Sequence, residues 1–303
     1  MVVTAFHTIT RTTLSRRGLI AAAAVTAITL RAGQRLTLAQ ETDKAPQNAV
    51  VWPKFNLNSA SSEQFMGIPG AGEKLTDEFE EYRPYTSIGQ FRAEIGKYIA
   101  PEDVAALEGY LFVPVDVNEA DAETLQQLPG VNADTAQQLI AGRPYADAAA
   151  FLKALEGIAG SELAAAAKTF LAPDAGNVAT WVKYDLNTAS SEQLQAIPGA
   201  GERMTREFEE YRPYTSIDQF RGEIGKYISP EEVAALEKYL FVPVDPNSAD
   251  ADTMQQLPGL TPSLVETINQ QRPFASADAF MQALQAQVSP ELVAAIAPYL
   301  TQS

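Results

Sequence analysis

Ile68-Pro69-Gly70-Ala71-Gly72 is the stretch that decides the fold, and the chain contains it in four related forms. The other three forms are Leu128-Pro129-Gly130-Val131-Asn132, Ile197-Pro198-Gly199-Ala200-Gly201 and Leu257-Pro258-Gly259-Leu260-Thr261. Proline cannot continue a preceding helix, and glycine accepts the positive φ of a tight turn without steric cost. Each stretch also lies between two segments with apolar residues at helical spacing. We therefore expect a hairpin between two helices at each of the four places.

The spacing of these hairpins indicates how the chain is organised. Their prolines lie 60, 69 and 60 residues apart, and the second half repeats the first at a constant offset of 129, so that Trp52 matches Trp181 and Phe170 matches Tyr299. A repeat without insertions indicates that a double unit was duplicated whole. We therefore predict an all-α fold of four related units, arranged as two duplicated halves that form separate domains with equivalent surfaces.

Local signals set the helix boundaries within the first unit. Ser61 stands three residues before Gln64, which is the spacing of a capping box, so a first helix is expected to follow. Ser87 is expected to cap a third helix that breaks at Gly96. Pro101 suits the first turn of a fourth helix, because a proline there costs no hydrogen bond.

These signals divide the chain into seven segments. A polar stretch without periodicity precedes the first unit, and a second one separates the halves, so both are expected to be flexible. The segments are a signal peptide (1–39), a tether (40–51), unit 1 (52–115), unit 2 with a degenerate hairpin (116–171), a linker (172–180), unit 3 (181–244) and unit 4 with a degenerate hairpin (245–303).

The N-terminal segment is typical of an export signal. Arg16-Arg17 precedes a short apolar run that ends at Leu30, which is too short to span a bilayer comfortably. A twin arginine before a mild apolar segment is typical of the Tat route. We therefore expect the protein to be exported and to reside in the periplasm or outside the cell.

Composition then limits the chemistry of the mature chain. Residues 1–39 hold five arginines and no acid, so 22 basic residues less 5 leaves 17 against 38 acidic ones, a net charge near −21 that repels other anions. The chain contains no cysteine, and its single histidine, His7, lies within the signal. The mature chain therefore lacks the commonest transition-metal ligands and the usual general base near neutral pH. We expect no catalytic residue, no metal site, no cofactor and no small-molecule substrate.

The residues around the hairpins also resemble a known family. The run from Leu186 to Gly201 resembles a helix-hairpin-helix unit of the ComEA-like competence DNA receptors, and the resemblance covers nearly all of residues 55–300 in four copies. It implies tandem helix-hairpin-helix domains that bind double-stranded DNA without reading its sequence. In that family, backbone N–H groups of the turn and the next helix hold a phosphate, helped by nearby cations.

The resemblance places candidate binding residues in units 1 and 3. These positions are Gly70, Ala71, Gly72 and Lys74 in unit 1, and Gly199, Ala200, Gly201 and Arg203 in unit 3. Units 2 and 4 have Asn132 and Thr261 in place of the second glycine, so close approach to a phosphate backbone is not expected there. The helix after each intact hairpin is strongly acidic, which opposes binding to phosphates.

A second, shorter resemblance points to another kind of partner. Unit 2, with Leu128-Pro129-Gly130 and Arg143-Pro144-Tyr145, is similar to the PsbU-type extrinsic subunit of photosystem II, a family that docks on membrane-protein loops. The fold therefore need not imply nucleic acid. We expect a binding or scaffold protein that docks on an exported or membrane-associated protein, with sequence-independent DNA binding as the alternative.

Two further motifs allow more than one interpretation. The arginine of each Arg-Pro-Tyr motif is expected to cap a helix C-terminus while the tyrosine packs on the next helix, although both could instead contact a base or a partner. Trp52 and Trp181 could be exposed interface anchors or could cover one end of each domain core.

Overall fold

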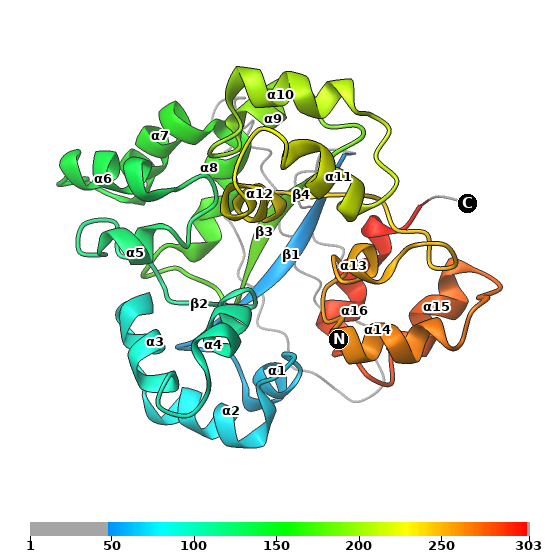
Figure 1. Ribbon diagram of the computed structural model, residues 1–303. Helices are drawn as coiled ribbons and strands as arrows, with labels where there is room; N and C mark the ends of the chain where they lie inside the picture. Colours follow the sequence, from blue (N-terminus) through cyan, green and yellow to red (C-terminus); the bar gives the residue numbers. More distant parts are fainter. Residues whose placement is uncertain (1–47, 302–303) are drawn as a thin grey trace, which may run out of the picture. The chain divides into compact units, whose positions relative to one another are not determined.

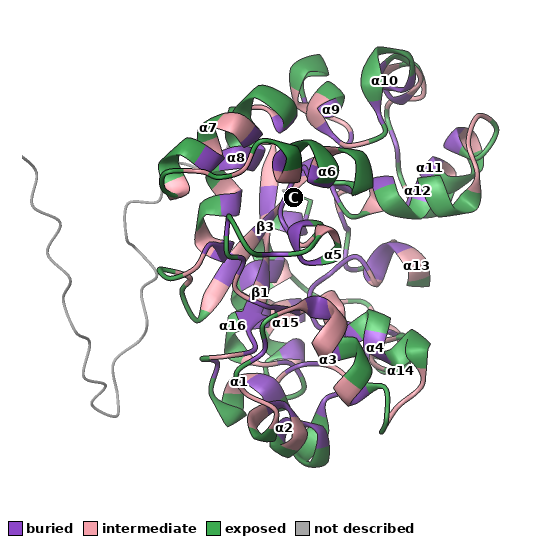
Figure 2. Cartoon of the chain, turned by 90° about the vertical axis from the view of Figure 1, so that its left-hand side faces the viewer, coloured by how far each residue is buried: buried purple, intermediate pink, exposed green. Residues whose placement is uncertain are grey.

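A computed structural model describes residues 48–301, shown in Figure 1. These residues belong to one compact unit, Asp43–Ser303. The predicted signal peptide, residues 1–39, and most of the predicted tether lie outside the described residues. Figure 2 shows the long strands at the centre of this unit, while the surrounding helices turn exposed faces outward.

The first half of the chain contains the helices that the hairpins predict, together with two strands. Unit 1 consists of β1 (Ala49–Asn56), α1 (Ser62–Met66), α2 (Gly72–Glu81), α3 (Ile88–Ile95), α4 (Pro101–Glu108) and β2 (Leu111–Phe112). Unit 2 consists of α5 (Ala122–Leu125), α6 (Ala133–Ala141), α7 (Ala148–Ala159), α8 (Ser161–Ala167) and the 3₁₀ turn η1 (Lys168–Phe170).

The second half repeats this order of elements. Unit 3 consists of β3 (Val178–Asp185), α9 (Ser191–Ala196), α10 (Gly201–Glu210), α11 (Ile217–Ile224), α12 (Pro230–Glu237) and β4 (Leu240–Phe241). Unit 4 consists of α13 (Ala251–Met254), α14 (Pro262–Asn269), α15 (Ala277–Leu284), α16 (Pro290–Ile296) and the 3₁₀ turn η2 (Ala297–Tyr299).

The predicted helix boundaries in unit 1 are confirmed. Ser61 and Gln64 form a reciprocal capping box at the start of α1. The Ser87 hydroxyl accepts a hydrogen bond from the Gln90 N–H and caps α3, which ends before Gly96. Pro101 is the first residue of α4. Each of these features depends on neighbours in the sequence, which is why the pattern alone predicts them.

The prediction of an all-α fold is only partly correct, because four strands form a mixed sheet in the order β2-β1-β3-β4. The long strands β1 and β3 are antiparallel, and each has a short parallel strand on its outer edge. β1 begins at Ala49, inside the segment predicted to be a tether, and β3 begins at Val178, inside the predicted linker. The ends of both segments are therefore ordered, because β1 and β3 pair with each other.

The register of β1 and β3 shows how the two halves are related. Trp52 lies directly opposite Trp181, its own equivalent at the offset of 129. The pairs on either side of it are equivalent to each other: the pair Ala49–Tyr184 on one side corresponds to the pair Phe55–Val178 on the other. The halves are therefore related by an internal two-fold axis that passes through the Trp52–Trp181 pair.

The hydrophobic core crosses between the halves, so the expectation of two separate domains is wrong. One buried cluster joins unit 2 to unit 3, from Phe112 to Val242. The other joins unit 1 to unit 4 and contains both Val50 and Leu300. Each unit therefore completes its core against a unit of the opposite half. The hydrophobic faces of the duplicated helices provide the apolar area that holds the halves together.

Candidate functional site

The hairpin turns of units 1 and 3 have the conformation that their glycines predict. Gly70 and Gly72 have φ of 84° and 60°, and Gly199 and Gly201 have φ of 88° and 58°. All four glycines are exposed. A Cβ atom added at any of them would meet no atom within 4 Å. The glycines of the two turns therefore lie at the surface, with open space beside each of them.

The central residue of each open turn anchors it to the protein. Ala71 and Ala200 are 3% and 5% exposed. The N–H of Ala71 donates to the Ile68 carbonyl, and that of Ala200 donates to the Ile197 carbonyl. Neither α2 nor α10 has a side chain that caps its first turn. The predicted binding residues of each unit are thus brought together at one uncapped helix start.

The hairpin turns of units 2 and 4 are buried by contrast. Gly130 and Gly259 also have positive φ, of 81° and 85°. A Cβ added at Gly130 would lie 2.4 Å from the Cβ of Ala159, and one at Gly259 would lie 2.5 Å from Cγ1 of Val288. These glycines are needed for close packing against the C-terminal part of their own unit, so the glycine side of each turn is closed to a ligand.

Tyrosines from the opposite half complete these buried turns. The Gly130 N–H donates to the Tyr239 hydroxyl at 3.3 Å, and the Gly259 N–H donates to the Tyr110 hydroxyl at 3.2 Å. Burial raises the pKa of Tyr110 to about 12, although the bond from Gly259 lowers it in part. These two tyrosines were not predicted from the sequence. Their only signal is their equivalence at the offset of 129.

Comparison with protein families agrees with this description of the helices. Residues 99–142, which extend from the end of unit 1 through the hairpin of unit 2, match the SAM-like helix-hairpin-helix tandem family. This segment is therefore similar to a helix-hairpin-helix tandem. A comparison with curated proteins finds no significant match, and a comparison with solved structures finds none either.

The helix-hairpin-helix tandem covers one of the buried turns and not the open ones. Its helices are α4, α5 and α6, joined through β2. Proteins with this fold serve as scaffolds that bind nucleic acids or other proteins. The candidate binding residues of units 1 and 3 lie outside the matched segment, so their role depends on their own geometry.

Each open turn combines one nearby cation with an acidic helix. Lys74 and Arg203 are exposed, and the Lys74 ammonium lies 5.8 Å from the centre of the Tyr98 ring. Arg206 forms an ion pair with Glu202 at 3.2 Å. The acidic side chains on α2 and α10 are Glu73, Asp77, Glu78, Glu80 and Glu81, and Glu202, Glu207, Glu209 and Glu210. An acidic side chain in the first turn of a helix already interacts favourably with the positive end of the helix dipole. It therefore competes with an anion for binding at the helix start.

The arginine of the Arg-Pro-Tyr motif has a structural role that differs from the predicted one. The Arg83 guanidinium donates to the Leu57 carbonyl at 2.5 Å and to the Ala60 carbonyl at 2.6 Å. It therefore holds the loop that opens its own unit and does not cap the end of α2. Arg143, Arg212 and Arg272 make the equivalent pairs of bonds in the other units. In all four arginines the Nε and Nη2 groups donate to backbone carbonyls of the same unit.

The tyrosine of the motif packs as predicted. Tyr85 is 2% exposed, and its ring centre lies 6.0 Å from that of Phe91 on α3. Its backbone is held by Asn58, whose side chain accepts from the Tyr85 N–H and donates to the Tyr85 carbonyl. Asn187 makes the same pair of bonds to Tyr214. The motif therefore stabilises each unit and does not form a ligand site.

The two tryptophans fit neither interpretation from the sequence. They face each other at the centre of the sheet, where Trp181 is buried and Trp52 is half-buried. The Trp52 indole N–H donates to the Gly109 carbonyl at 2.9 Å, and that of Trp181 donates to the Lys238 carbonyl at 2.7 Å. They lie on the internal two-fold axis and neither cover the end of a domain nor stand out from the surface.

Residues 48–301 contain neither a cluster of metal-ligating side chains nor a helix able to span a membrane. No three histidine, cysteine, aspartate or glutamate side chains in this range come close enough together to hold a metal ion. None of the helices there has the length and apolar character that crossing a bilayer requires.

Proposed function

We propose that the mature chain is a non-catalytic binding protein that docks on a protein partner through two equivalent surfaces, the open hairpins of units 1 and 3. The observation that carries this proposal is the contrast between the turns. Gly70 and Gly199 are exposed with nothing packed against them, whereas Gly130 and Gly259 are buried by α7–α8 and α15–α16. Turn chemistry alone requires glycine at all four places, but only two turns are left open to a partner.

The charge around the open turns indicates what kind of partner would fit. α2 and α10 each carry several exposed or half-exposed acids beside the turn, with Lys74 or Arg203 among them. A complementary partner presents basic side chains, because like charges at an interface repel and opposite charges steer association. Two equivalent surfaces on one chain can engage two sites of the partner and so bind more tightly than either alone.

The proposed location is outside the cytoplasm. The twin arginine and the short apolar run of residues 1–39 support export by a Tat-type route. The proposed partner is therefore an exported protein or the exposed loops of a membrane protein, as the PsbU-type resemblance suggests. The lack of cysteine, and of histidine outside the signal, supports a role in binding without catalysis.

Sequence-independent binding of double-stranded DNA is the second candidate. It is supported by the uncapped starts of α2 and α10 and by the cations Lys74 and Arg203, which match the ComEA-like arrangement. Helix N-termini with free N–H groups favour phosphate. The acidic side chains of the same helices oppose it, since neutralised phosphates supply most of the affinity of such proteins for DNA.

Charge reversal at the turns tests the protein-docking proposal. We would capture partners from a nuclease-treated exported fraction with the wild-type chain, with Glu73→Lys/Glu202→Lys and with a control, Glu119→Lys, an exposed acid in unit 2. We expect the wild type and the control to retain a stoichiometric protein partner and the double variant to lose it. Each single variant should retain partial binding, because one surface remains. Equal capture by all variants would contradict the proposal.

The DNA alternative is tested by a duplex titration at low salt. Binding to the hairpins should fall steeply as salt rises and should weaken with Lys74→Glu/Arg203→Glu. The control is Lys153→Glu, an exposed lysine on α7. If no duplex is bound at low ionic strength, the alternative is excluded. If duplex is bound and no protein partner is captured, DNA binding replaces docking as the function.

A further inference from the structure

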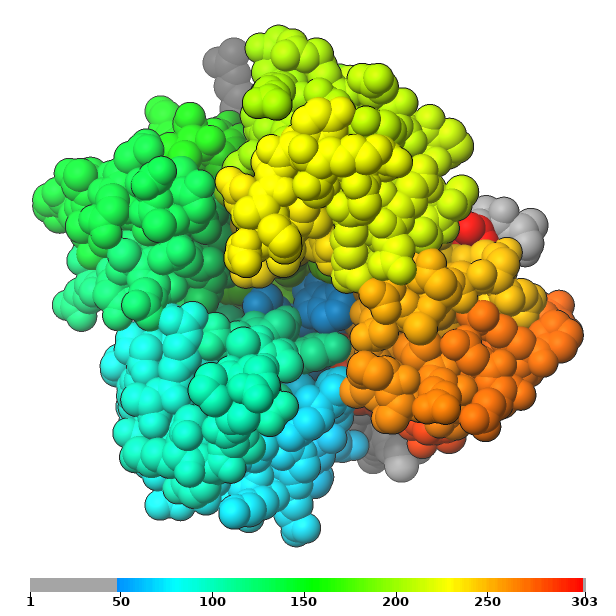
Figure 3. All heavy atoms as spheres, in the orientation of Figure 1, coloured from blue at the N-terminus to red at the C-terminus, as the bar shows by residue number. Residues whose placement is uncertain are grey.

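A central cleft of about 1050 Å³ lies over one face of β1 and β3. Figure 3 shows it as a hollow at the centre of this face, with β1 in blue at its bottom and the four units around it. The residues that line it come from both long strands, from α3, α4, α5 and α12, and from the turn at Pro198 and Gly199. Its volume is slightly above the range of about 300 to 1,000 Å³ for sites that bind small molecules.

The floor of the cleft is formed by two tryptophans and two lysines. Lys54 and Lys183 are equivalent at the offset of 129, and each lies over the tryptophan of the other half. The Lys54 ammonium is 5.4 Å from the centre of the Trp181 ring, and the Lys183 ammonium is 4.9 Å from that of Trp52. Because both indole N–H groups are bonded to backbone carbonyls, the rings are fixed and hold the lysine stems in place.

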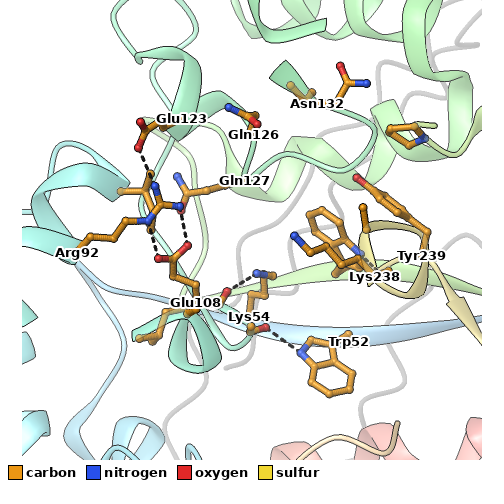
Figure 4. A pocket seen from close by; sticks show the side chains of 18 of the residues that line it. Trp52, Lys54, Arg92, Glu108, Glu123, Gln126, Gln127, Asn132, Lys238 and Tyr239 are labelled. Carbon is orange, nitrogen blue, oxygen red and sulfur yellow. Dashed lines mark hydrogen bonds and ion pairs between the residues drawn. The ribbon is translucent and has the colours of Figure 1, made fainter. Parts of the chain in front are cut away.

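The acids of the cleft are already paired. Arg92 forms ion pairs with Glu108 and with Glu123, both at 2.7 Å, as Figure 4 shows. The remaining charged residues that line the cleft are Lys54, Lys183 and the exposed Lys238. None of these three lysines forms an ion pair within residues 48–301. The cleft thus contains a group of cations inside a strongly acidic protein.

The positive charges of Lys54 and Lys183 are only partly balanced by acidic side chains in the folded protein. Burial lowers the pKa of Lys54 to about 8; Glu108 opposes the shift, while Lys238 and Lys183 add to it. Burial likewise lowers the pKa of Lys183 to about 8, against the effect of Glu237. The Lys54 ammonium donates to the Glu108 backbone carbonyl at 2.6 Å, which leaves it two further N–H groups. An anion in the cleft would compensate these charges directly.

The other polar groups of the cleft are largely occupied, and its walls are apolar. The Gln127 side chain bonds to the backbone of Val113, and the Asn132 side chain caps α6. Pro101, Ala105 and Ala235 are exposed and contribute apolar surface. The charged groups of the cleft without an ion-pair partner in residues 48–301 are therefore the three ammonium groups, which lie beside surface that suits a hydrocarbon or aromatic group.

We propose that this cleft binds a small organic anion, whose carboxylate or phosphate group contacts Lys54, Lys183 and Lys238 and whose apolar body packs on the walls. The cleft shares Pro198 and Gly199 with the open hairpin of unit 3, but the lysines that would hold the anion lie outside both open hairpins. Binding of the anion therefore does not depend on the function proposed for the hairpins. Strong hydrogen bonds between the ammonium groups and an anion would provide affinity. The glutamates of the cleft are paired with Arg92, so they would not compete with the anion for the ammonium groups.

A matched pair of fluorescent probes tests the proposal. Anilinonaphthalene sulfonate carries an anionic group on an apolar body, and N-phenylnaphthylamine has nearly the same body without the charge. We would titrate each probe with the full mature chain, with Lys54→Met/Lys183→Met and with the control Lys153→Met, an exposed lysine on α7. Methionine keeps an unbranched stem over the indoles, and circular dichroism would verify that each variant is folded.

We expect the sulfonate to bind the wild type and the control equally and to bind the double variant at least about tenfold more weakly, as the loss of charged hydrogen bonds implies. The neutral probe should bind the wild type and the double variant alike. The affinity for the sulfonate should also fall as pH rises above about 8, because the free lysines then lose their protons. Unchanged affinity of the folded double variant for the sulfonate would overturn the proposal. The proposal would also be overturned if the wild type bound the neutral probe more tightly than it binds the sulfonate.

Discussion

Lys183 is a side chain whose charge opposes folding, which makes its effect on stability dependent on pH. Burial lowers its pKa from 10.5 to about 8, so below pH 8 the lysine is charged in both the folded and the unfolded chain, and the folded chain bears the cost. Between pH 8 and 10.5 the unfolded chain binds more protons, so this contribution to the free energy of unfolding rises with pH. Above 10.5 the cost has disappeared.

We therefore predict that Lys183→Met stabilises the protein at pH 7. The gain should be on the order of 1 kcal/mol, because partial exposure screens part of the cost that the shift in pKa implies. It should shrink through pH 8 to 10.5 and vanish above that range. Urea unfolding at a series of pH values measures it, with Lys153→Met as the control for the loss of a lysine charge. A variant less stable than the wild type at pH 7 would contradict this account.

Arg83 is a second residue whose contribution can be measured. Its guanidinium satisfies two backbone carbonyls of the loop that opens unit 1, and it lies 5.0 Å from the Phe65 ring centre. Arg83→Ala leaves both carbonyls without this partner, so we predict a loss of about 3 kcal/mol in the free energy of unfolding. Arg203→Ala, at an exposed site, should cost less than about 0.5 kcal/mol. Equal midpoints in urea for the two variants would show that the contacts of Arg83 do not stabilise the loop.

The hairpins allow the same substitution to be compared in two environments. Gly70→Ala and Gly130→Ala both place a Cβ on a residue with positive φ, which costs about 1 to 2 kcal/mol in either turn. At Gly130 the new Cβ also lies 2.4 Å from the Cβ of Ala159, and at Gly70 it meets nothing. We predict that Gly130→Ala lowers the free energy of unfolding by at least about 2 kcal/mol more than Gly70→Ala. Thermal unfolding of the two variants would measure the difference, and similar melting temperatures would show that the turn of unit 2 is not tightly packed.

The hairpins and helices were predictable because their signals are local. Pro69, Ser87 and Pro101 each act on neighbours within a few residues, so the sequence specifies where helices begin and end. Asn132, which stands in place of the second glycine of the turn, also indicated that unit 2 differs from unit 1. It could not show that Gly130 is buried, because the tyrosine that bonds to this turn lies 109 residues further along the chain.

The sheet and the central cleft were not predictable by the same means. β1 and β3 pair with each other although they lie about 130 residues apart in the sequence. Each strand begins in a polar segment whose composition predicts a flexible linker. One signal was present in retrospect. Trp52-Pro53-Lys54 recurs as Trp181-Val182-Lys183, which places a tryptophan and a lysine on the same face of each strand. Only the antiparallel pairing brings the two copies together to form the floor of the cleft.

At the scale of the whole molecule, the internal two-fold axis joins the halves into one body. The unit 1 core is continuous with that of unit 4, and the unit 2 core with that of unit 3. A single half therefore lacks a partner for both of its cores and for the inner edge of β1. Because Trp52 pairs with its own equivalent, a second copy of the same half can replace the missing one with the same register.

We predict that residues 48–176, expressed alone, form a dimer in which β1 of one copy pairs antiparallel with β1 of the other. Light scattering should give twice the mass of the fragment, and the melting temperature should rise with protein concentration, since the dimer is stabilised by mass action. Trp52→Glu places two like charges opposite each other on the axis and should prevent the dimer from forming. A cooperatively folded monomer of the fragment would contradict the prediction, because it would show that each half completes its own core.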